Sequence, residues 1–173
     1  ASKGEGLGNK FLSHVREVDT IIHLTRCFDS EKIQNVNKNV DPIRDLEIIE
    51  TEILLSDLES LQKRLEKSNK KKLEKDELNF LEDCLKLINN GKKPYELKKK
   101  YNKELINKSS LLSLKPRIIV CNVDEKSLPG GNKYSDSCKK KFSDENIVIV
   151  CADIEDQIMS LQSKDRKDFM FES

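Results

Sequence analysis

The stretch that decides the fold is Lys115-Pro-Arg-Ile-Ile-Val-Cys-Asn-Val-Asp-Glu125. Residues 118–121 form an unbroken apolar run without polar alternation, which is typical of a parallel strand that helices cover on both faces. Residues 122–125 follow at the point where this strand ends. Ligands of open α/β sheets bind beyond the carboxyl ends of the strands, so residues 122–125 are the first candidate for a binding site.

Two further stretches predict buried strands of the same kind. Residues 20–28 are β-branched and apolar, and Asp19 and Asp29 bound them. Residues 147–151 form another apolar run that ends in small and polar side chains. Helical patterns separate the three runs, including short helices over 134–142 and after residue 153. The sequence therefore predicts an α/β fold in which flanking helices accompany a parallel sheet.

Residues 41–114, between the first two predicted strands, carry helical patterns. Asp41-Pro42 supplies a side-chain cap and a proline at the first helical position. The helix that follows has an apolar seam with coiled-coil spacing, after an offset earlier stripe. The seam consists of Thr51, Leu54, Leu58, Leu61 and Leu65, and the stripe of Leu46, Ile49 and Ile53. A second helix ends at Asn90-Gly91, and Pro94 begins a third that runs through Ile106. The pattern predicts an inserted α-helical coiled-coil hairpin.

Composition limits the size of the core. Of the 173 residues, 36% are charged and 5% are aromatic, with no Trp, so much of the chain must lie on solvated helix surface. The net charge is only +1, but residues 41–66 carry eight acidic and three basic side chains. Residues 67–108 carry thirteen lysines and seven acids. These neighbouring segments of opposite sign attract each other.

The cysteines and histidines give no metal-ligand spacing. The five cysteines include no Cys-x-x-Cys pair, which indicates reduced, buried thiols of a cytosolic protein. They are Cys27, Cys84, Cys121, Cys138 and Cys151. His14 and His23 stand apart from each other and from the cysteines, so no metal ligand is predicted. No apolar run approaches the ~20 residues of a membrane span, and no signal peptide precedes Lys3, so we expect a cytoplasmic protein without membrane contact.

Four stretches together resemble the YchF, or Obg-like, ATPase family of P-loop proteins. They are residues 1–12, 18–28, 45–52 with 55–59, and Asn122-Val-Asp-Glu125, and the ending Asp165-Arg-Lys-Asp-Phe-Met170 is similar too. The resemblance implies the C-terminal half of a P-loop GTPase-like domain. No G-x-x-x-x-G-K-[ST] motif occurs in the sequence. We therefore expect a fragment that lacks the N-terminal phosphate-loop region and the C-terminal TGS domain of the family.

The resemblance also implies a domain organisation. Residues 1–40 correspond to part of the nucleotide-binding domain, 41–114 to the inserted helical coiled-coil domain, and 115–173 to the rest of the nucleotide-binding domain. The glycines at the start of the chain, Gly4, Gly6 and Gly8, resemble the second switch, which responds to the γ-phosphate. Taken alone they are a weak signal, because a mobile linker has the same composition.

The resemblance assigns the nucleotide base to residues after the second and third predicted strands. Asn122, Val123 and Glu125 occupy the base-reading positions, and Cys151-Ala152 occupies a turn that closes over the base. Guanine-selective relatives use Asn-Lys-x-Asp, whose carboxylate accepts from two adjacent guanine donors. A glutamate is one methylene longer and leaves that bidentate register, so ATP is favoured over GTP. A polar turn after a buried strand is the simpler alternative. Mg²⁺ is expected to bind with the nucleotide in the intact parent, through ligands outside this chain.

One position departs from the family. Asn35 stands where members carry a histidine that is associated with hydrolysis. An amide cannot act as a general base, although it can orient a water molecule by hydrogen bonding. No catalytic residue is therefore assigned in this chain.

Two classes of function follow. The first is a ribosome-associated protein that hydrolyses ATP or GTP, of which this chain carries the base-recognition half and is inactive alone. The second is a non-catalytic module whose helical hairpin binds RNA or a protein partner through lysines such as 98–100; the same lysines also suit a solvated surface. The resemblance to P-loop GTPases also implies that the predicted strands pair in the spatial order 20–28, 116–121, 147–151, all parallel. The edge at 20–28 is then uncovered, and self-association through it is expected.

Overall fold

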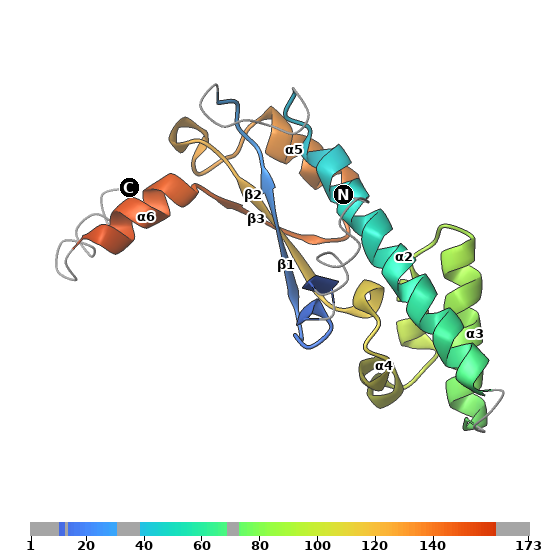
Figure 1. Ribbon diagram of the computed structural model, residues 1–173. Helices are drawn as coiled ribbons and strands as arrows, with labels where there is room; N and C mark the ends of the chain where they lie inside the picture. The colour runs from blue at the N-terminus through green and yellow to red at the C-terminus, as the bar shows by residue number, and fades with distance from the viewer. Residues whose placement is uncertain (1–10, 13, 31–38, 69–72, 162–173) are drawn as a thin grey trace. The chain divides into compact units, whose positions relative to one another are not determined.

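The computed structural model describes residues 11, 12, 14–30, 39–68 and 73–161 (Figure 1). Its contacts divide the chain into two compact units. The helical unit comprises Ala1–Ile21 and Glu47–Pro116, and the sheet unit comprises Ile22–Leu46 and Arg117–Ser173. Gly4, Gly6, Gly8 and Asn35, the residues assigned to the second switch and to the histidine position, lie outside the described residues.

Three parallel strands, β1 (Ile21–Arg26), β2 (Arg117–Asn122) and β3 (Asn146–Val150), form one sheet in the order β1-β2-β3. β2 and β3 pair in parallel, with Cys121 opposite Ile149. The Ile21 N–H donates to the Pro116 carbonyl at 2.9 Å and the Cys27 N–H to the Asn122 carbonyl at 2.7 Å, so β1 runs in the same direction as β2. The predicted strands and their spatial order are confirmed.

The two faces of the sheet differ. One face packs into a core with Leu46 at the start of α2 (Pro42–Ser68) and with Cys138 and Phe142 at α5 (Lys133–Lys141). On the other face Ile22 is 69% exposed, Leu24 59% and Val148 46%. The prediction of strands buried on both faces was therefore wrong for the described part of the chain. The apolar residues that alternate with the buried ones along each strand were interpreted as buried too, but no described helix packs over them.

A glycine and an asparagine set the start of α5. Gly131 has a φ of +95°, and a Cβ added there would lie 2.3 Å from the Ser135 Oγ, so only glycine fits. Asn132 caps the helix by accepting from the N–H groups of Tyr134 and Ser135 at 3.0 and 3.3 Å. Its Nδ2 donates to the Cys27 carbonyl at 2.7 Å, which fixes the end of β1. The predicted short helix is confirmed, as is α6 (Ala152–Ser160) after β3.

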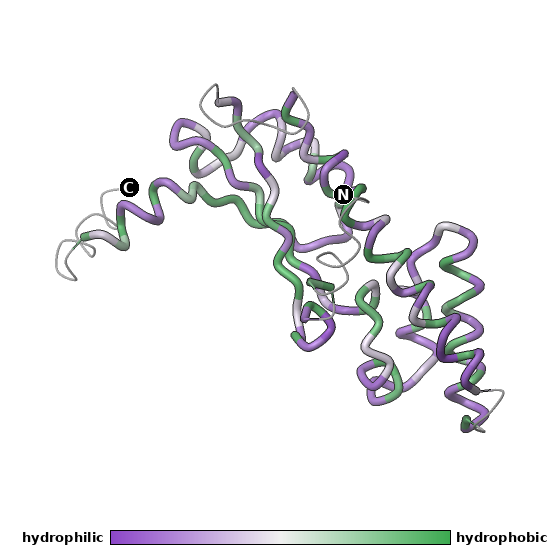
Figure 2. The backbone as a smooth tube through the Cα atoms, viewed as in Figure 1, coloured by the Kyte–Doolittle hydropathy of each residue, from purple (hydrophilic) through white to green (hydrophobic). Residues whose placement is uncertain are grey.

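In the helical unit, α3 (Lys75–Asn89) packs with the later part of α2. Figure 2 shows hydrophobic and hydrophilic residues alternating along both helices. The buried core consists of Leu61, Phe80, Leu81, Cys84, Ile88, Leu97, Leu111 and Leu114. The predicted seam is confirmed from Leu54 to Leu65, whereas Thr51 at its start and Ile49 in the earlier stripe are exposed. Asp41 accepts from the Arg44 N–H at 3.1 Å, as expected for the cap.

The predicted third helix was wrong as a single element. The chain forms a 3₁₀ helix η1 (Pro94–Lys99), then α4 (Lys103–Ser109) and a short 3₁₀ turn η2 (Leu112–Leu114). The break has a local cause, because the Asn102 side chain accepts from the Leu105 N–H at 2.7 Å and starts a new helix. The apolar spacing continues across the break and therefore does not reveal it.

A buried aspartate, which the sequence did not single out, braces the helical unit. Asp57 on α2 is fully buried and accepts from the N–H groups of Leu112 and Ser113 at 3.0 and 2.8 Å. Its carboxylate also accepts from the Ser113 hydroxyl at 2.7 Å and from Arg16 at 3.1 Å. A buried carboxylate is stable only with such partners, so Asp57 fixes η2 and the segment of Arg16 against α2.

Candidate functional site

The carboxyl ends of β2 and β3 are joined by a side chain. The Asn122 Oδ1 accepts a hydrogen bond from the Ala152 N–H at 2.9 Å. One residue further on, the Val123 N–H donates to the Val150 carbonyl at 2.8 Å. Because a backbone N–H can only donate, the Asn122 amide must present its oxygen to Ala152. Its Nδ2 group is then available as a donor beside the strand ends.

Val123 points into the protein. It is 1% exposed and belongs to the core cluster under the sheet, together with Ile119 and Cys121. A side chain packed in this way has no surface to offer a ligand. The contribution of this position to a site at the strand ends is limited to its backbone and to the packing that holds the loop.

Glu125 and its neighbour Asp124 are both exposed acids of the loop after β2. Glu125 begins the 3₁₀ turn η3 (Glu125–Ser127). Its side chain makes no hydrogen bond or ion pair with another described residue. Its neighbour Asp124 accepts from the Ser127 hydroxyl and thereby fixes the turn. Of the two consecutive acids, Glu125 is thus the one that is free to accept hydrogen bonds from a ligand.

The turn after β3 brings α6 to the same edge. Cys151 is almost fully buried at the start of the helix, and Ala152 is exposed in its first turn. A cysteine buried there holds the turn in place, and the small Ala152 leaves room beside its own N–H. The structure therefore brings Asn122 and Ala152 together, leaves Glu125 exposed three residues after Asn122, and buries the side chains of Val123 and Cys151.

The end of β1 carries polar residues that sequence reasoning passed over. Asp29 accepts from the Tyr134 hydroxyl at 2.8 Å, and this hydrogen bond raises the pKa of Tyr134. Asn132 reaches both the Cys27 carbonyl and the Ser127 hydroxyl, at 2.7 and 3.1 Å. Asp29 directly follows a predicted strand, as Asn122 does. This position in the sequence could have identified Asp29 as a candidate site residue. These contacts hold the β1 end and the 127–132 loop as one piece.

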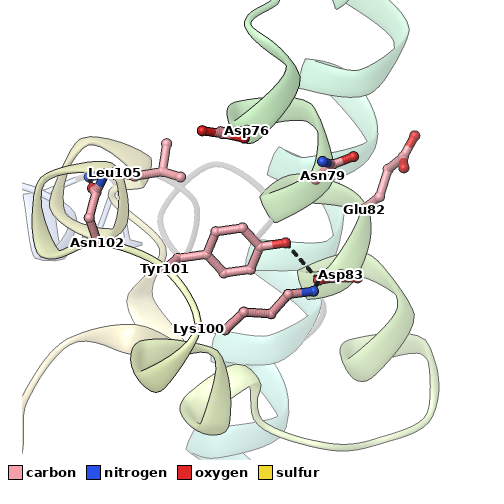
Figure 3. Close-up of a pocket in the computed structure, with 8 residues that line it drawn as sticks. All are labelled: Asp76, Asn79, Glu82, Asp83, Lys100, Tyr101, Asn102 and Leu105. Carbon is pink, nitrogen blue, oxygen red and sulfur yellow. Dashed lines mark hydrogen bonds and ion pairs between the residues drawn. The ribbon is translucent and has the colours of Figure 1, made fainter.

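A separate polar pocket lies in the helical unit (Figure 3). Asp83 accepts there from the Lys100 Nζ at 2.5 Å and from the Tyr101 hydroxyl at 2.7 Å. Both hydrogen bonds lower the pKa of Asp83, with Lys100 the larger cause. Asp76, Asn79, Glu82, Asn102 and Leu105 complete the lining. An ion pair already occupies its only lysine, so the pocket offers mainly carboxylates and no cation to hold a phosphate.

No helix in the described ranges is long and apolar enough to cross a membrane. Among the described residues, the one group of three or more neighbouring His, Cys, Asp or Glu side chains that could hold a metal ion consists of three thiols. Mg²⁺ prefers oxygen ligands, so this group does not suit it.

No family model matches the chain. It is 36% identical over 184 residues to the ribosome-binding ATPase YchF of Bacillus subtilis (strain 168), a match that covers 99% of this chain and 50% of that protein. It is 37% identical over 181 residues to the protein of the same name from Escherichia coli O157:H7, covering 99% and 49%. Among solved structures, the Schizosaccharomyces pombe YchF GTPase matches with a TM-score of 0.81 and 32% identity, over 99% of this chain and 50% of that one. The chain spans about half the length of the curated relatives it matches.

Proposed function

The chain belongs to the YchF family, and from this we propose that it forms the base-recognition half of a nucleotide-binding domain in a ribosome-associated protein that hydrolyses ATP. The observation that carries the proposal is the 2.9 Å hydrogen bond from the Ala152 N–H to the Asn122 Oδ1. It fixes two strand-end loops at the edge where ligands of α/β sheets bind, and the exposed Glu125 follows Asn122 by three residues.

Two side chains have different parts in this proposal. The Asn122 Nδ2 donates to a ring nitrogen such as N7, which adenine and guanine share, so Asn122 supports affinity for both. Glu125 accepts from the exocyclic amino group of the base. Guanine presents two adjacent donors to a carboxylate, whereas adenine presents one donor beside an acceptor. Glu125 therefore sets the choice between the bases.

The phosphates and Mg²⁺ belong to another part of the protein in this proposal. The sequence contains no phosphate-binding G-x-x-x-x-G-K-[ST] motif. Positioning and neutralising the phosphates supply nearly all of the catalysis in this class of enzyme. We therefore expect the 173-residue chain alone to show no nucleotide hydrolysis, and the full-length protein to hydrolyse ATP.

Equilibrium binding of ATP and GTP to the full-length protein tests the proposal. Asn122→Ala should weaken the binding of both nucleotides about 10-fold, because it removes one hydrogen bond between uncharged groups and loosens the turn. Glu125→Asp should shift the ATP-to-GTP affinity ratio toward GTP and leave hydrolysis chemistry intact. Asn146→Ala, an exposed asparagine at the opposite end of β3, is the matched control and should change neither. Unchanged binding by Asn122→Ala would contradict the proposal.

Val123→Lys is not a useful variant for this purpose, although it would restore the residue of guanine-selective relatives. The Val123 side chain is 1% exposed within the core. A lysine there would bury a charge and destabilise the sheet unit, so a loss of nucleotide binding would not report on the base.

The alternative function, an RNA- or protein-binding helical module, has weaker support. Lys100 and Lys108 pair with Asp83 and Glu77, and Lys93 pairs with Glu50 on α2. Lysines held by carboxylates are less available to phosphates. If the helical unit nevertheless binds ribosomal RNA, Lys98→Glu with Lys99→Glu should weaken ribosome binding without changing ATP affinity.

A further inference from the structure

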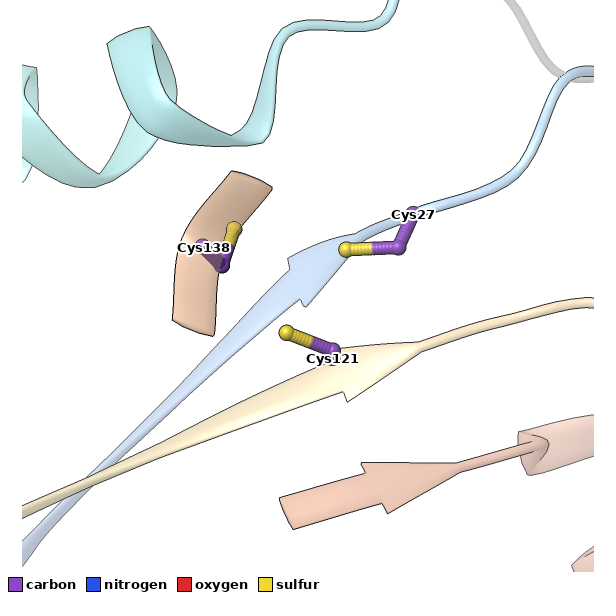
Figure 4. A group of neighbouring side chains, drawn as sticks. All are labelled: Cys27, Cys121 and Cys138. Carbon is purple, nitrogen blue, oxygen red and sulfur yellow. The ribbon is translucent and has the colours of Figure 1, made fainter. Parts of the chain in front are cut away.

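Three cysteines that are far apart in the sequence meet inside the sheet unit. The Sγ atoms of Cys27, Cys121 and Cys138 all lie within 4.8 Å of one another, and all three residues are fully buried. Figure 4 shows them pointing toward one another from the end of β1, from β2 and from α5. We call these three residues the thiol cluster. From its geometry we propose that the thiol cluster binds one soft metal ion through three sulfurs, and that Cu(I) is the ion that fits it best.

The spacing of the sulfurs suits a metal centre. Thiolate–metal bonds are about 2.3 Å long, so three sulfurs arranged in a plane around one ion lie about 4 Å apart. The observed separations, all within 4.8 Å, require shifts of less than an ångström to reach this arrangement. Rotation about the Cα–Cβ bonds supplies such shifts without moving the backbone.

Hydrogen bonds fix the backbone at each residue of the thiol cluster. The Cys27 N–H donates to the Asn122 carbonyl and the Cys27 carbonyl accepts from the Asn132 Nδ2, both at 2.7 Å. Cys121 pairs in the ladder with Ile149 of β3. Cys138 lies inside α5, where its carbonyl accepts from the Phe142 N–H at 2.9 Å. The three ligands are therefore preorganised by contacts that are independent of any metal.

The surroundings favour a three-coordinate ion. Leu46, Ile119 and Phe142 pack against the thiol cluster, and no histidine or carboxylate joins the three sulfurs in the described part of the chain. Zn²⁺ in proteins is almost always four-coordinate and would need a water that this apolar shell does not admit. Thiolate ligands select soft ions such as Cu(I), which accepts a planar set of three sulfurs.

Metal binding to the thiol cluster is coupled to the loss of protons. The three thiols hydrogen-bond one another, and the thiolate, not the thiol, is the form that binds a metal ion. A cation would therefore displace thiol protons as it binds.

Titration of the full-length, reduced and metal-free protein with Cu(I), in competition with a chromophoric Cu(I) chelator, tests the proposal. We expect one tightly bound Cu(I) per thiol cluster, a rise in Tm, and an X-ray absorption spectrum with three sulfur neighbours. Cys27→Ala, Cys121→Ala and Cys138→Ala should each weaken binding about 100-fold or more. Cys84→Ala, an equally buried cysteine of the helical core, is the matched control and should leave Cu(I) affinity unchanged.

Several outcomes would overturn the proposal. They are no competitive Cu(I) binding by the wild-type protein, wild-type Cu(I) affinity in the three cluster variants, or a loss of Cu(I) affinity in Cys84→Ala as large as in those variants. A single sulfur neighbour in the absorption spectrum would indicate an adventitious ion. Tight binding of Zn²⁺ with three sulfurs and one oxygen would show that water enters the cluster, and would overturn the three-coordinate Cu(I) assignment. Because the wild-type measurement stands alone, variants that fail to fold do not prevent a decision.

Discussion

Among the residues that the structure describes, the helical unit completes its own core, whereas the sheet unit leaves one face of its sheet open. In the helical unit, eight buried apolar side chains from α2, α3, η1 and the segment around η2 pack into one cluster, and Asp57 finds four hydrogen-bond donors. In the sheet unit the core lies on one side only, and Ile22 and Leu24 of the edge strand are largely exposed. An apolar sheet face of this kind is normally covered. The comparison indicates that the helical unit buries its apolar side chains by itself. The sheet unit needs a further covering layer to bury the second face of its sheet.

The largest expected effect comes from Asp57→Ala. This change leaves the N–H groups of Leu112 and Ser113 and the Arg16 guanidinium without their buried acceptor. Removing one partner of such a network costs about 3–5 kcal/mol, and we expect the Tm of the helical unit to fall accordingly. Circular dichroism melts measure this. Glu59→Ala, an exposed acid on the same helix, is the control and should shift Tm by far less. If the two variants lower Tm equally, Asp57 does not stabilise the helical unit in the way proposed.

The second prediction concerns the open face. In the 173-residue chain, Ile22→Lys with Leu24→Lys should reduce self-association, because it places charges on an exposed edge strand. Sedimentation at several concentrations should show a monomer for the variant and association for the wild type. In the full-length protein the same pair should instead lower stability, because the rest of the nucleotide-binding domain is expected to cover this face. Lys126→Glu, an exposed charge change away from the strand faces, is the control.

Hydrogen exchange compares the two units directly. We expect the amides of Thr20–Phe28 to exchange faster than those of Leu54–Leu65 in the 173-residue chain, because β1 is an edge strand with one open face. The buried seam of α2 is protected by the helical core. Slower exchange in β1, in a monodisperse monomer, would reverse the comparison.

The strands were predicted well because their apolar runs are local and strong, and their spatial order was predicted from the resemblance to P-loop GTPases. The sequence also predicted α2 well, because the cap at Asp41-Pro42 and the apolar seam from Leu54 to Leu65 are both local sequence patterns. It missed the break at Asn102, where a capping side chain competes with continued apolar spacing. It also missed Asp57 and the thiol cluster, because the partners of Asp57 lie 41 to 56 residues away and only the fold brings the cysteines together.

At the candidate site, the sequence named two loops that the structure joins by a hydrogen bond, but it did not give the orientation of each side chain. The pairing of Asn122 with Ala152 joins loops 30 residues apart, and strand alternation alone turns Val123 into the core. A motif names positions, whereas the direction of each side chain follows from the register of β2 and β3.

The smallest expected effect is the pH dependence of the Asp83 pair. The hydrogen bonds from Lys100 and Tyr101 lower the pKa of Asp83 below its ordinary value of 3.8. The pair therefore adds stability at pH values above 3.8, and this contribution is lost as the pH falls through the lower pKa of the folded state. Because water screens an exposed pair of this kind, we expect the contribution to be small. Melts of the wild type and of Asp83→Asn between pH 2 and 7 should show a small difference in Tm at neutral pH, and this difference should shrink as the pH falls below 3.8. Asp76→Asn, which leaves the pair intact on the same helix, should follow the wild type. A difference that persists at the acid end would mean that the asparagine disturbs the pocket by its shape rather than by its charge.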